Sequence, residues 1–92
     1  MALLDDTEIQ NKLNELSGWE HFGNEIIKSY KLTNFISSIG FVNKIAILAE
    51  KADHHPDILI KYSRVKITLS THSEGGITIK DLDLATEIEG AF

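Results

Sequence analysis

Apolar residues recur every three or four positions in three segments of the chain, which is the pattern of helices with a buried face. The first segment has N-cap candidates at positions 5–7 and a stop signal at Gly18. The last segment begins behind Thr78, and Asp81 stands three residues further on in the relation of a capping box. We therefore predict a helix near each end of the chain.

The middle helical segment is the longest, with an N-cap candidate at Asn34 and an end near Asp53. It carries two apolar stripes, which are Phe35, Ile39, Val42, Ala46 and Ala49 on one side and Phe41, Ile45 and Leu48 on another. Two stripes need two surfaces to pack against. One surface can be the sheet of the same chain and the other a second copy of the chain, although a helix central to its own domain would show the same pattern.

Shorter segments, in which apolar and polar residues alternate or aromatic and β-branched residues gather, predict four strands. In chain order these strands are residues 19–22, 26–32, 58–62 and 65–69. Gly23-Asn24 is the turn of the first hairpin, and Ser63-Arg64 is the turn of the second. Pro56 is expected to end the long helix, and residues 71–76 form a loop after the fourth strand.

The order helix, two strands, helix, two strands, helix predicts an α+β fold in which three helices pack on one face of a four-stranded antiparallel sheet. The 92 residues contain no linker, repeat or low-complexity segment, so we expect a single domain over residues 1–92. A domain of this size has one modest core, and burying more surface against a second copy would stabilise it.

Composition and charge exclude several classes of protein. The absence of cysteine rules out disulfides, thiolate nucleophiles and zinc fingers. The net charge of -5 argues against a nucleic-acid partner, because such binding usually depends on clustered Lys and Arg. No apolar run reaches the roughly 18 residues of a membrane-spanning helix, and no secretory signal opens the sequence. We expect a cytoplasmic protein that contacts neither membrane nor nucleic acid.

The residues that could carry chemistry gather near the end of the long helix, where His54 and His55 stand side by side before Pro56. Glu50 is four residues before His54 and can share its helical face, so it could orient that imidazole. His72 lies at the end of the fourth strand. The hairpin can return this end to the start of the third strand, beside the His pair.

Three interpretations of these histidines remain open. A His pair at a helix C-terminus can simply place favourable charge there. Three histidines and a water can hold zinc, although adjacent His side chains diverge and the helical i, i+4 ligand pair is missing. The third interpretation is metal-free acid–base chemistry, because imidazole exchanges protons near neutral pH. Asp81 also has a structural interpretation, since a carboxylate at its position completes a capping box.

These residues and their spacing resemble the signature of the pterin-4a-carbinolamine dehydratase family, known also as the dimerisation cofactor of a homeodomain transcription factor. In that signature a charged residue is followed by three spacers, His-His-Pro, an aromatic residue, a further His and an Asp. The residues that match it at the family's intervals are Glu50, His54-His55-Pro56, Tyr62, His72 and Asp81. The likeness extends from about Phe41 to Ala85.

The resemblance implies dehydration of 4a-hydroxytetrahydropterin to quinonoid dihydropterin, which recycles the pterin after aromatic amino acid hydroxylation. His54 and His72 would be the principal acid–base pair, and His55 would mainly bind and position the pterin. Asp81 would complete the catalytic set by holding a histidine in orientation. Further contacts with the substrate would come from Glu50, Asp53, Ser70, Thr71 and Ser73.

The resemblance also implies that the pterin is the substrate and that no cofactor or metal is required. It implies a homodimer or homotetramer formed through the 34–53 helix and a sheet edge, and a link to an aromatic amino acid hydroxylase pathway. The alternative function is a non-enzymatic regulatory role, in which the chain stabilises the oligomer of a partner protein.

Overall fold

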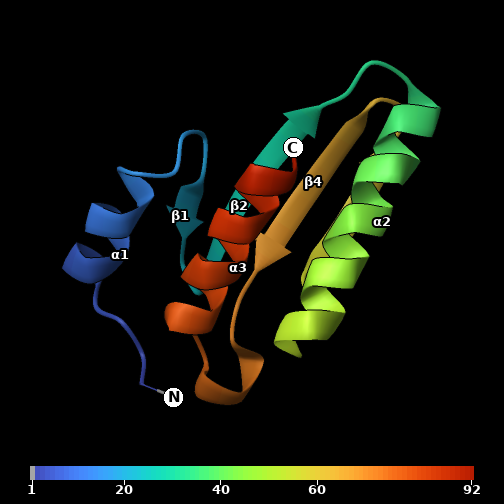
Figure 1. Ribbon diagram of the computed structural model, residues 1–92. Helices are drawn as coiled ribbons and strands as arrows, with labels where there is room; N and C mark the ends of the chain where they lie inside the picture. The colour runs from blue at the N-terminus through green and yellow to red at the C-terminus, as the bar shows by residue number, and fades with distance from the viewer. Residues whose placement is uncertain (1) are drawn as a thin grey trace.

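The computed structural model describes residues 2–92, over which three helices, a short 3-10 turn and one sheet are formed (Figure 1). In chain order the elements are α1 (Asp6–Leu13), β1 (Glu20–Phe22), β2 (Glu25–Lys31), α2 (Phe35–Ala52), β3 (Asp57–Lys61), β4 (Arg64–Leu69), the 3-10 turn η1 (His72–Glu74) and α3 (Ile79–Ala91). All neighbouring strands are antiparallel, in the order β1-β2-β4-β3. The predicted fold class and element order are confirmed.

The helices cover one face of the sheet, and the core lies between the two layers. In Figure 1, α3 lies in front of β2, α2 lies beside β4 on the same side of the sheet, and α1 lies beside β1. The central strands alternate, so that Ile26 and Tyr30 of β2 and Val65, Ile67 and Leu69 of β4 are buried beneath the helices. The helices complete the core with Phe41 and Ile45 of α2 and with Leu82, Leu84, Ala85 and Ile88 of α3.

The turn between β3 and β4 lies one residue earlier than the sequence predicted. Lys61 pairs with Arg64, so the two-residue turn is formed by Tyr62 and Ser63. Tyr62 adopts a positive φ of 55°, which suits a tight hairpin turn, and its side chain is exposed. Alternation of apolar residues continues formally through Tyr62, and periodicity alone does not show where the chain reverses.

The first helix is also shorter than predicted, because it ends at Leu13 and does not continue to Gly18. The amides of Glu15 and Leu16 bond to carbonyls only three residues earlier, so the chain tightens into turns there. Leu16 remains buried, which explains why the helical spacing continued past the helix.

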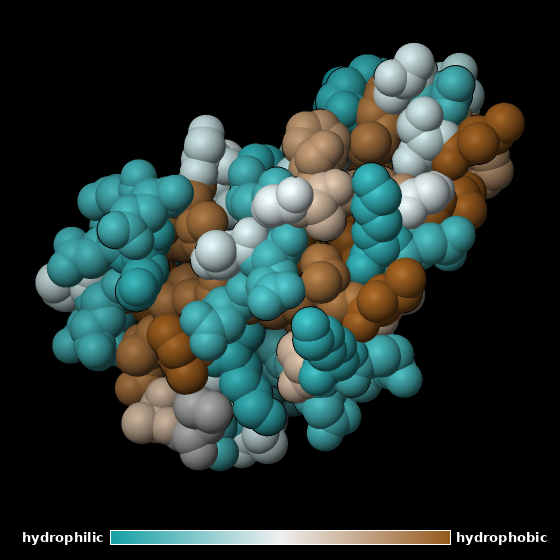
Figure 2. Space-filling view, in the orientation of Figure 1, coloured by the Kyte–Doolittle hydropathy of each residue, from teal (hydrophilic) through white to brown (hydrophobic). Residues whose placement is uncertain are grey.

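Within residues 2–92, only one apolar side of α2 is covered by other parts of the fold. Phe41, Ile45 and Ala49 are buried, whereas Ile36 and Ile47 are 82% and 69% exposed. Phe35 and Ile39 extend the exposed apolar side, and Figure 2 shows hydrophobic surface over α2. Although α2 is apolar on two sides, neither it nor any other helix within residues 2–92 is long and apolar enough to cross a bilayer.

A carboxylate ties the C-terminal end of α3 to the sheet. Oε1 of Glu89 accepts hydrogen bonds from Nε1 of Trp19 at 3.1 Å, from Nζ of Lys28 at 2.5 Å and from the hydroxyl of Tyr30. Burial opposes ionisation of Glu89, but these three hydrogen bonds and the charge of Lys28 outweigh it and hold the pKa of Glu89 below its ordinary value. Burial and the neighbouring carboxylate raise the pKa of Tyr30.

Candidate functional site

The predicted site residues gather at one end of the sheet. Asp57, at the start of β3, pairs with Thr68 near the end of β4. The segment that precedes β3 therefore begins at the same end of the sheet as the segment that follows β4. The first segment carries His54 and His55, and the second carries His72 and leads into α3.

A left-handed residue ends α2 and sets the direction of His54. Asp53 has φ 51° and ψ 44°, its N–H bonds to the carbonyl of Glu50, and the N–H of His54 bonds to the carbonyl of Ala49. These bonds form a Schellman turn, in which Asp occupies the position usually taken by Gly. The turn therefore ends the helix before Pro56 can do so.

The turn separates His54 from Glu50. The spacing in the sequence suggested that Glu50 pairs with His54. In the structure Glu50 pairs with His55 instead, and its Oε2 lies 2.5 Å from Nε2 of that ring. The i, i+4 relation holds only while the helix continues, and His54 lies beyond its left-handed end. The side chains of His55 and Glu50 are 59% and 76% exposed, so this pair is accessible and weakly held.

His54 instead reaches the first turn of α3. Its Nε2 lies 2.6 Å from Oδ1 of Asp81, and neither side chain is more than 10% exposed. A carboxylate can only accept, so the hydrogen of the imidazole lies on Nε2 and is donated to Asp81. In the neutral ring this leaves Nδ1 as a proton acceptor. The role of Asp81 in orienting a histidine stays a prediction, and His54 is the histidine that it contacts.

Asp81 is fully buried, and its second oxygen is also occupied. Oδ2 accepts a hydrogen bond from the hydroxyl of Thr71 at 2.7 Å and from the N–H of Thr78 at 2.9 Å. The second bond belongs to the capping box of α3, which confirms the structural interpretation of Asp81. Three donors compensate the cost of burying this charge, so the carboxylate is held in one orientation.

His72 faces a different part of the site. It is exposed in η1 and lines a cavity of about 360 Å³ together with Ser70, Gly75 and, from the first hairpin, Asn24 and Glu25. Among residues 2–92, no hydrogen bond joins the side chain of His72 to His54 or His55. The fold thus brings the three histidines to one end of the sheet, and no hydrogen bond within residues 2–92 joins them.

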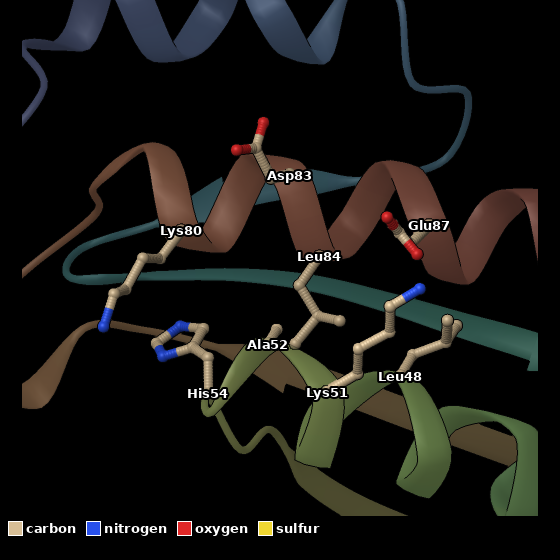
Figure 3. Close-up of a pocket in the computed structure, with 8 residues that line it drawn as sticks. All are labelled: Leu48, Lys51, Ala52, His54, Lys80, Asp83, Leu84 and Glu87. Atoms are coloured by element: carbon tan, nitrogen blue, oxygen red, sulfur yellow. The ribbon is translucent and has the colours of Figure 1, made fainter.

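A second cavity, of about 280 Å³, lies between α2 and α3 and has His54 on its wall (Figure 3). Its apolar wall is formed by Leu48, Ala52 and Leu84, and its charged lining by Lys51, Lys80, Asp83 and Glu87. Figure 3 shows the His54 ring at one end of this cavity, beside the side chain of Lys80. Sequence reasoning missed all four charged residues. The available signal was the position of Lys80 next to Asp81 and of Lys51 near His54.

The described residues contain no preformed metal cluster. Within residues 2–92, no three His, Asp or Glu side chains converge closely enough to hold a metal ion. The expectation that the site works without a metal or cofactor stays a prediction.

Comparisons with known proteins identify the family. A family model described as pterin 4 alpha carbinolamine dehydratase matches residues 2–91. A relative from Roseiflexus castenholzii is 52% identical over 88 residues, which cover 96% of this chain and 95% of the relative. A relative from Sulfolobus acidocaldarius is 48% identical over 85 residues, covering 92% and 93%. Both relatives are provisionally named pterin-4-alpha-carbinolamine dehydratases.

Solved structures show the same relationship. A transcriptional coactivator/pterin dehydratase from Brucella melitensis is 36% identical, covers 98% of both chains and superposes with a TM-score of 0.94. A pterin dehydratase-like protein described as a RuBisCO assembly factor in the alpha-carboxysome is 18% identical. It covers 79% of this chain and 84% of its own with a TM-score of 0.66, which shows the shared fold alone.

Proposed function

Because the chain belongs to the pterin-4a-carbinolamine dehydratase family, we propose that it is a dehydratase that converts 4a-hydroxytetrahydropterin to quinonoid dihydropterin and water. The observation that carries this proposal is the buried bond between His54 and Asp81 on the wall of a cavity. An imidazole that is fixed through one nitrogen and has the other free is suited to move a proton in each turnover.

The reaction needs one proton removed and one proton supplied. The proton on N5 of the pterin leaves as the bond between C4a and N5 becomes double, and the hydroxyl on C4a departs as water once it is protonated. We assign proton removal to Nδ1 of His54, because the carboxylate of Asp81 stabilises the imidazolium that forms. His72, which is exposed, supplies the proton to the hydroxyl. Such general acid–base catalysis contributes about 100- to 10,000-fold, or roughly 3–5 kcal/mol of barrier.

The remaining predicted residues are proposed to hold the substrate. The accessible His55–Glu50 pair lies at the end of α2, and Ser70 lies with His72 on the wall of the 360 Å³ cavity. Asp53 and Ser73 are exposed in the turns next to them. The pterin is the substrate in this scheme and no cofactor takes part. The place of the reaction would be the recycling of tetrahydropterin after aromatic hydroxylation.

The experiment that tests this function is a dehydratase assay. A hydroxylase generates 4a-hydroxytetrahydropterin in situ, and its ultraviolet decay is followed with and without the protein. We expect faster decay with the protein and loss of that effect in the double variant His54→Ala/His72→Ala. The matched control is His21→Ala, because His21 lies in the first hairpin and bonds only to the carbonyl of Gly23 among the described residues. No acceleration by micromolar protein would contradict the proposal.

The exposed apolar side of α2 supports the further proposal that the chain forms a homodimer or homotetramer. Phe35, Ile36, Ile39 and Ile47 follow one another along this side over most of the helix. An apolar surface of this continuity is commonly an interface in soluble proteins. A copy of the same helix offers a matching apolar surface, and the exposed edge of β3 offers a second place for contact.

The oligomer is tested by mass measurement in solution. We expect Ile36→Asp and Ile47→Asp to lower the molar mass measured by light scattering, whereas Lys44→Asp, on another side of the same helix, leaves it unchanged. A monomeric wild type would contradict the proposal.

The same apolar surface favours the alternative function, a regulatory role in a partner's oligomer. This alternative gains support if the dehydratase assay is negative while the partner-binding surface is intact.

A further inference from the structure

Two threonine hydroxyls are buried behind Asp81, on the side away from His54. Thr71 follows β4 and is 5% exposed, and Thr78 precedes α3 and is fully buried. Their hydroxyl oxygens lie 2.8 Å apart, and Oγ1 of Thr71 lies 2.7 Å from Oδ2 of Asp81. The two hydroxyls therefore form a chain that ends on the carboxylate that His54 contacts.

The direction of every hydrogen in this chain follows from counting donors. The carboxylate of Asp81 has no hydrogen to give, so Thr71 donates its only hydroxyl hydrogen to Oδ2. The hydrogen between the two threonines must then come from Thr78. Thr78 in turn accepts from the N–H of Lys80 at the start of α3. All the hydrogens point toward Asp81, an arrangement in which each bond strengthens the next.

Thr71 also fastens the loop that carries His72. Its N–H bonds to the carbonyl of Gly76, and its carbonyl accepts from the N–H groups of Glu74 and Gly75. The backbone of Thr71 thus closes the turn that presents His72, and its side chain fixes Asp81. One buried residue, Thr71, therefore connects the carboxylate that holds His54 with the turn that carries His72, although no hydrogen bond among the described residues joins the two histidines.

The N-cap of α3 does not require the hydroxyl of Thr71. The cap is complete with the side chain of Thr78 and the carboxylate of Asp81. The hydroxyl of Thr71 adds a bond to Oδ2, opposite the oxygen that accepts from His54. Its effect is therefore on the orientation of the carboxylate and, through the carboxylate, on the ring of His54.

We propose that Thr71 and Thr78 are positioning residues, whose hydroxyls hold Asp81 so that His54 keeps its hydrogen on Nε2 and presents Nδ1. The effect on turnover rests on the proposed dehydratase function, but the effect on His54 does not. The sequence predicted that Thr71 contacts the pterin through its side chain or its backbone. In this proposal its hydroxyl hydrogen is already used within the protein.

The wild-type protein provides the first test, by nitrogen-15 NMR of the histidine rings without substrate. We expect His54 in its neutral form to carry hydrogen on Nε2, with an Nε2–H signal that exchanges slowly with water. A neutral ring with its hydrogen on Nδ1 would overturn the proposal without any variant.

The second test replaces the hydroxyl and keeps the shape of the side chain. In Thr71→Val we expect exchange of the His54 Nε2–H to become at least about tenfold faster. The reason is that Asp81, which accepts this hydrogen, loses the hydrogen bond from the Thr71 hydroxyl. We expect kcat of dehydration to fall roughly 10- to 100-fold with KM nearly unchanged. Thr71→Ser, which restores the hydroxyl, should recover both.

The two readouts separate this proposal from the proposed function. Unchanged exchange of the His54 hydrogen in Thr71→Val would overturn the positioning role, and so would a change in KM alone, which would indicate direct contact with the substrate. Faster exchange in Thr71→Val together with an inactive wild type would support the positioning role and contradict the dehydratase function.

Discussion

The two ends of α3 carry similar arrangements in different surroundings. Asp81 in its first turn and Glu89 in its last turn each accept three hydrogen bonds from side chains or backbone. One donor to Asp81 is the imidazole of His54, which exchanges protons near neutral pH. The donors to Glu89 are an indole, an ammonium and a phenol, which keep their hydrogens there. At each end of α3 a carboxylate that accepts three hydrogen bonds stabilises the fold. Of the two ends, the one with His54 is suited to proton transfer.

The two carboxylates also differ in burial. Asp81 is fully buried and uses both of its oxygens, whereas the side chain of Glu89 is 25% exposed and receives all three bonds on Oε1. Water can replace part of what Glu89 loses when a partner is removed, but it cannot reach Asp81. The comparison therefore predicts that substitution of Asp81 lowers the free energy of unfolding more than substitution of Glu89.

The largest expected effect on stability is that of Asp81→Ala. This change leaves the hydrogens of His54, Thr71 and the Thr78 amide without their acceptor and removes half of the capping box. We expect the free energy of unfolding to fall by about 3–5 kcal/mol, measured by urea denaturation at neutral pH. A loss below about 1 kcal/mol would show that the buried network is not held as the structure describes.

A smaller effect is expected for Glu89→Gln at the other end. Lys28 loses its ionic partner while the amide still accepts some hydrogen bonds, so the free energy of unfolding should fall by about 1–3 kcal/mol. The dehydration rate of the folded variant should match that of the wild type. Glu20→Gln, an exposed carboxylate on β1, is the matched control. A loss of turnover in Glu89→Gln would remove the distinction between the two ends.

Lowering the pH should remove the contribution of Glu89 to the free energy of unfolding. Its pKa is lowered in the folded protein, so its stabilisation is complete above the ordinary value of about 4.5 and is lost as the pH falls through the lower folded pKa. We expect the difference in unfolding free energy between wild type and Glu89→Gln to shrink as the pH falls below about 4.5. Urea titrations at several pH values measure this difference. A difference that grew on acidification would contradict the lowered pKa.

The smallest effect is expected for Glu50→Gln. The pair that Glu50 forms with His55 is mostly exposed, so its loss should change the free energy of unfolding by less than about 1 kcal/mol. If this pair holds the pterin, KM should rise while kcat changes little. Steady-state kinetics separates the two constants, and a fall in kcat without a change in KM would place Glu50 with the chemistry and not with binding.

Local sequence signals predicted much of the fold. The caps at Asn34 and Thr78 and the capping-box partner Asp81 lie within a few residues of one another, so the pattern along the chain contains the necessary information. The turn at Tyr62 and Ser63 was displaced by one residue, because an exposed tyrosine with positive φ continues the apolar alternation of its strand. The end of α2 at Asp53 was attributed to Pro56 because no Gly marks the Schellman turn.

The site was less predictable, since its contacts join distant parts of the chain. The spacing of Glu50 and His54 suggested a pair, but the left-handed Asp53 redirects the chain and gives Glu50 to His55. The resemblance pointed to Asp81 as a partner for a histidine, and the fold decides that this histidine is His54. Nothing local in the sequence indicates that Thr71 bonds to Asp81 or that Lys80 lies beside His54, because both relations arise only when α3 packs against the end of α2.

The most direct test of the account is the dehydration rate of Asp81→Asn compared with that of Glu89→Gln, each measured where the variant is fully folded. Asparagine keeps the shape of Asp81 and removes the charge that faces His54. We predict that Asp81→Asn lowers kcat about 100-fold or more and that Glu89→Gln leaves kcat within about twofold of the wild type. Equal effects at the two positions, or full turnover in Asp81→Asn, would contradict the claim that the N-terminal end of α3 carries the chemistry.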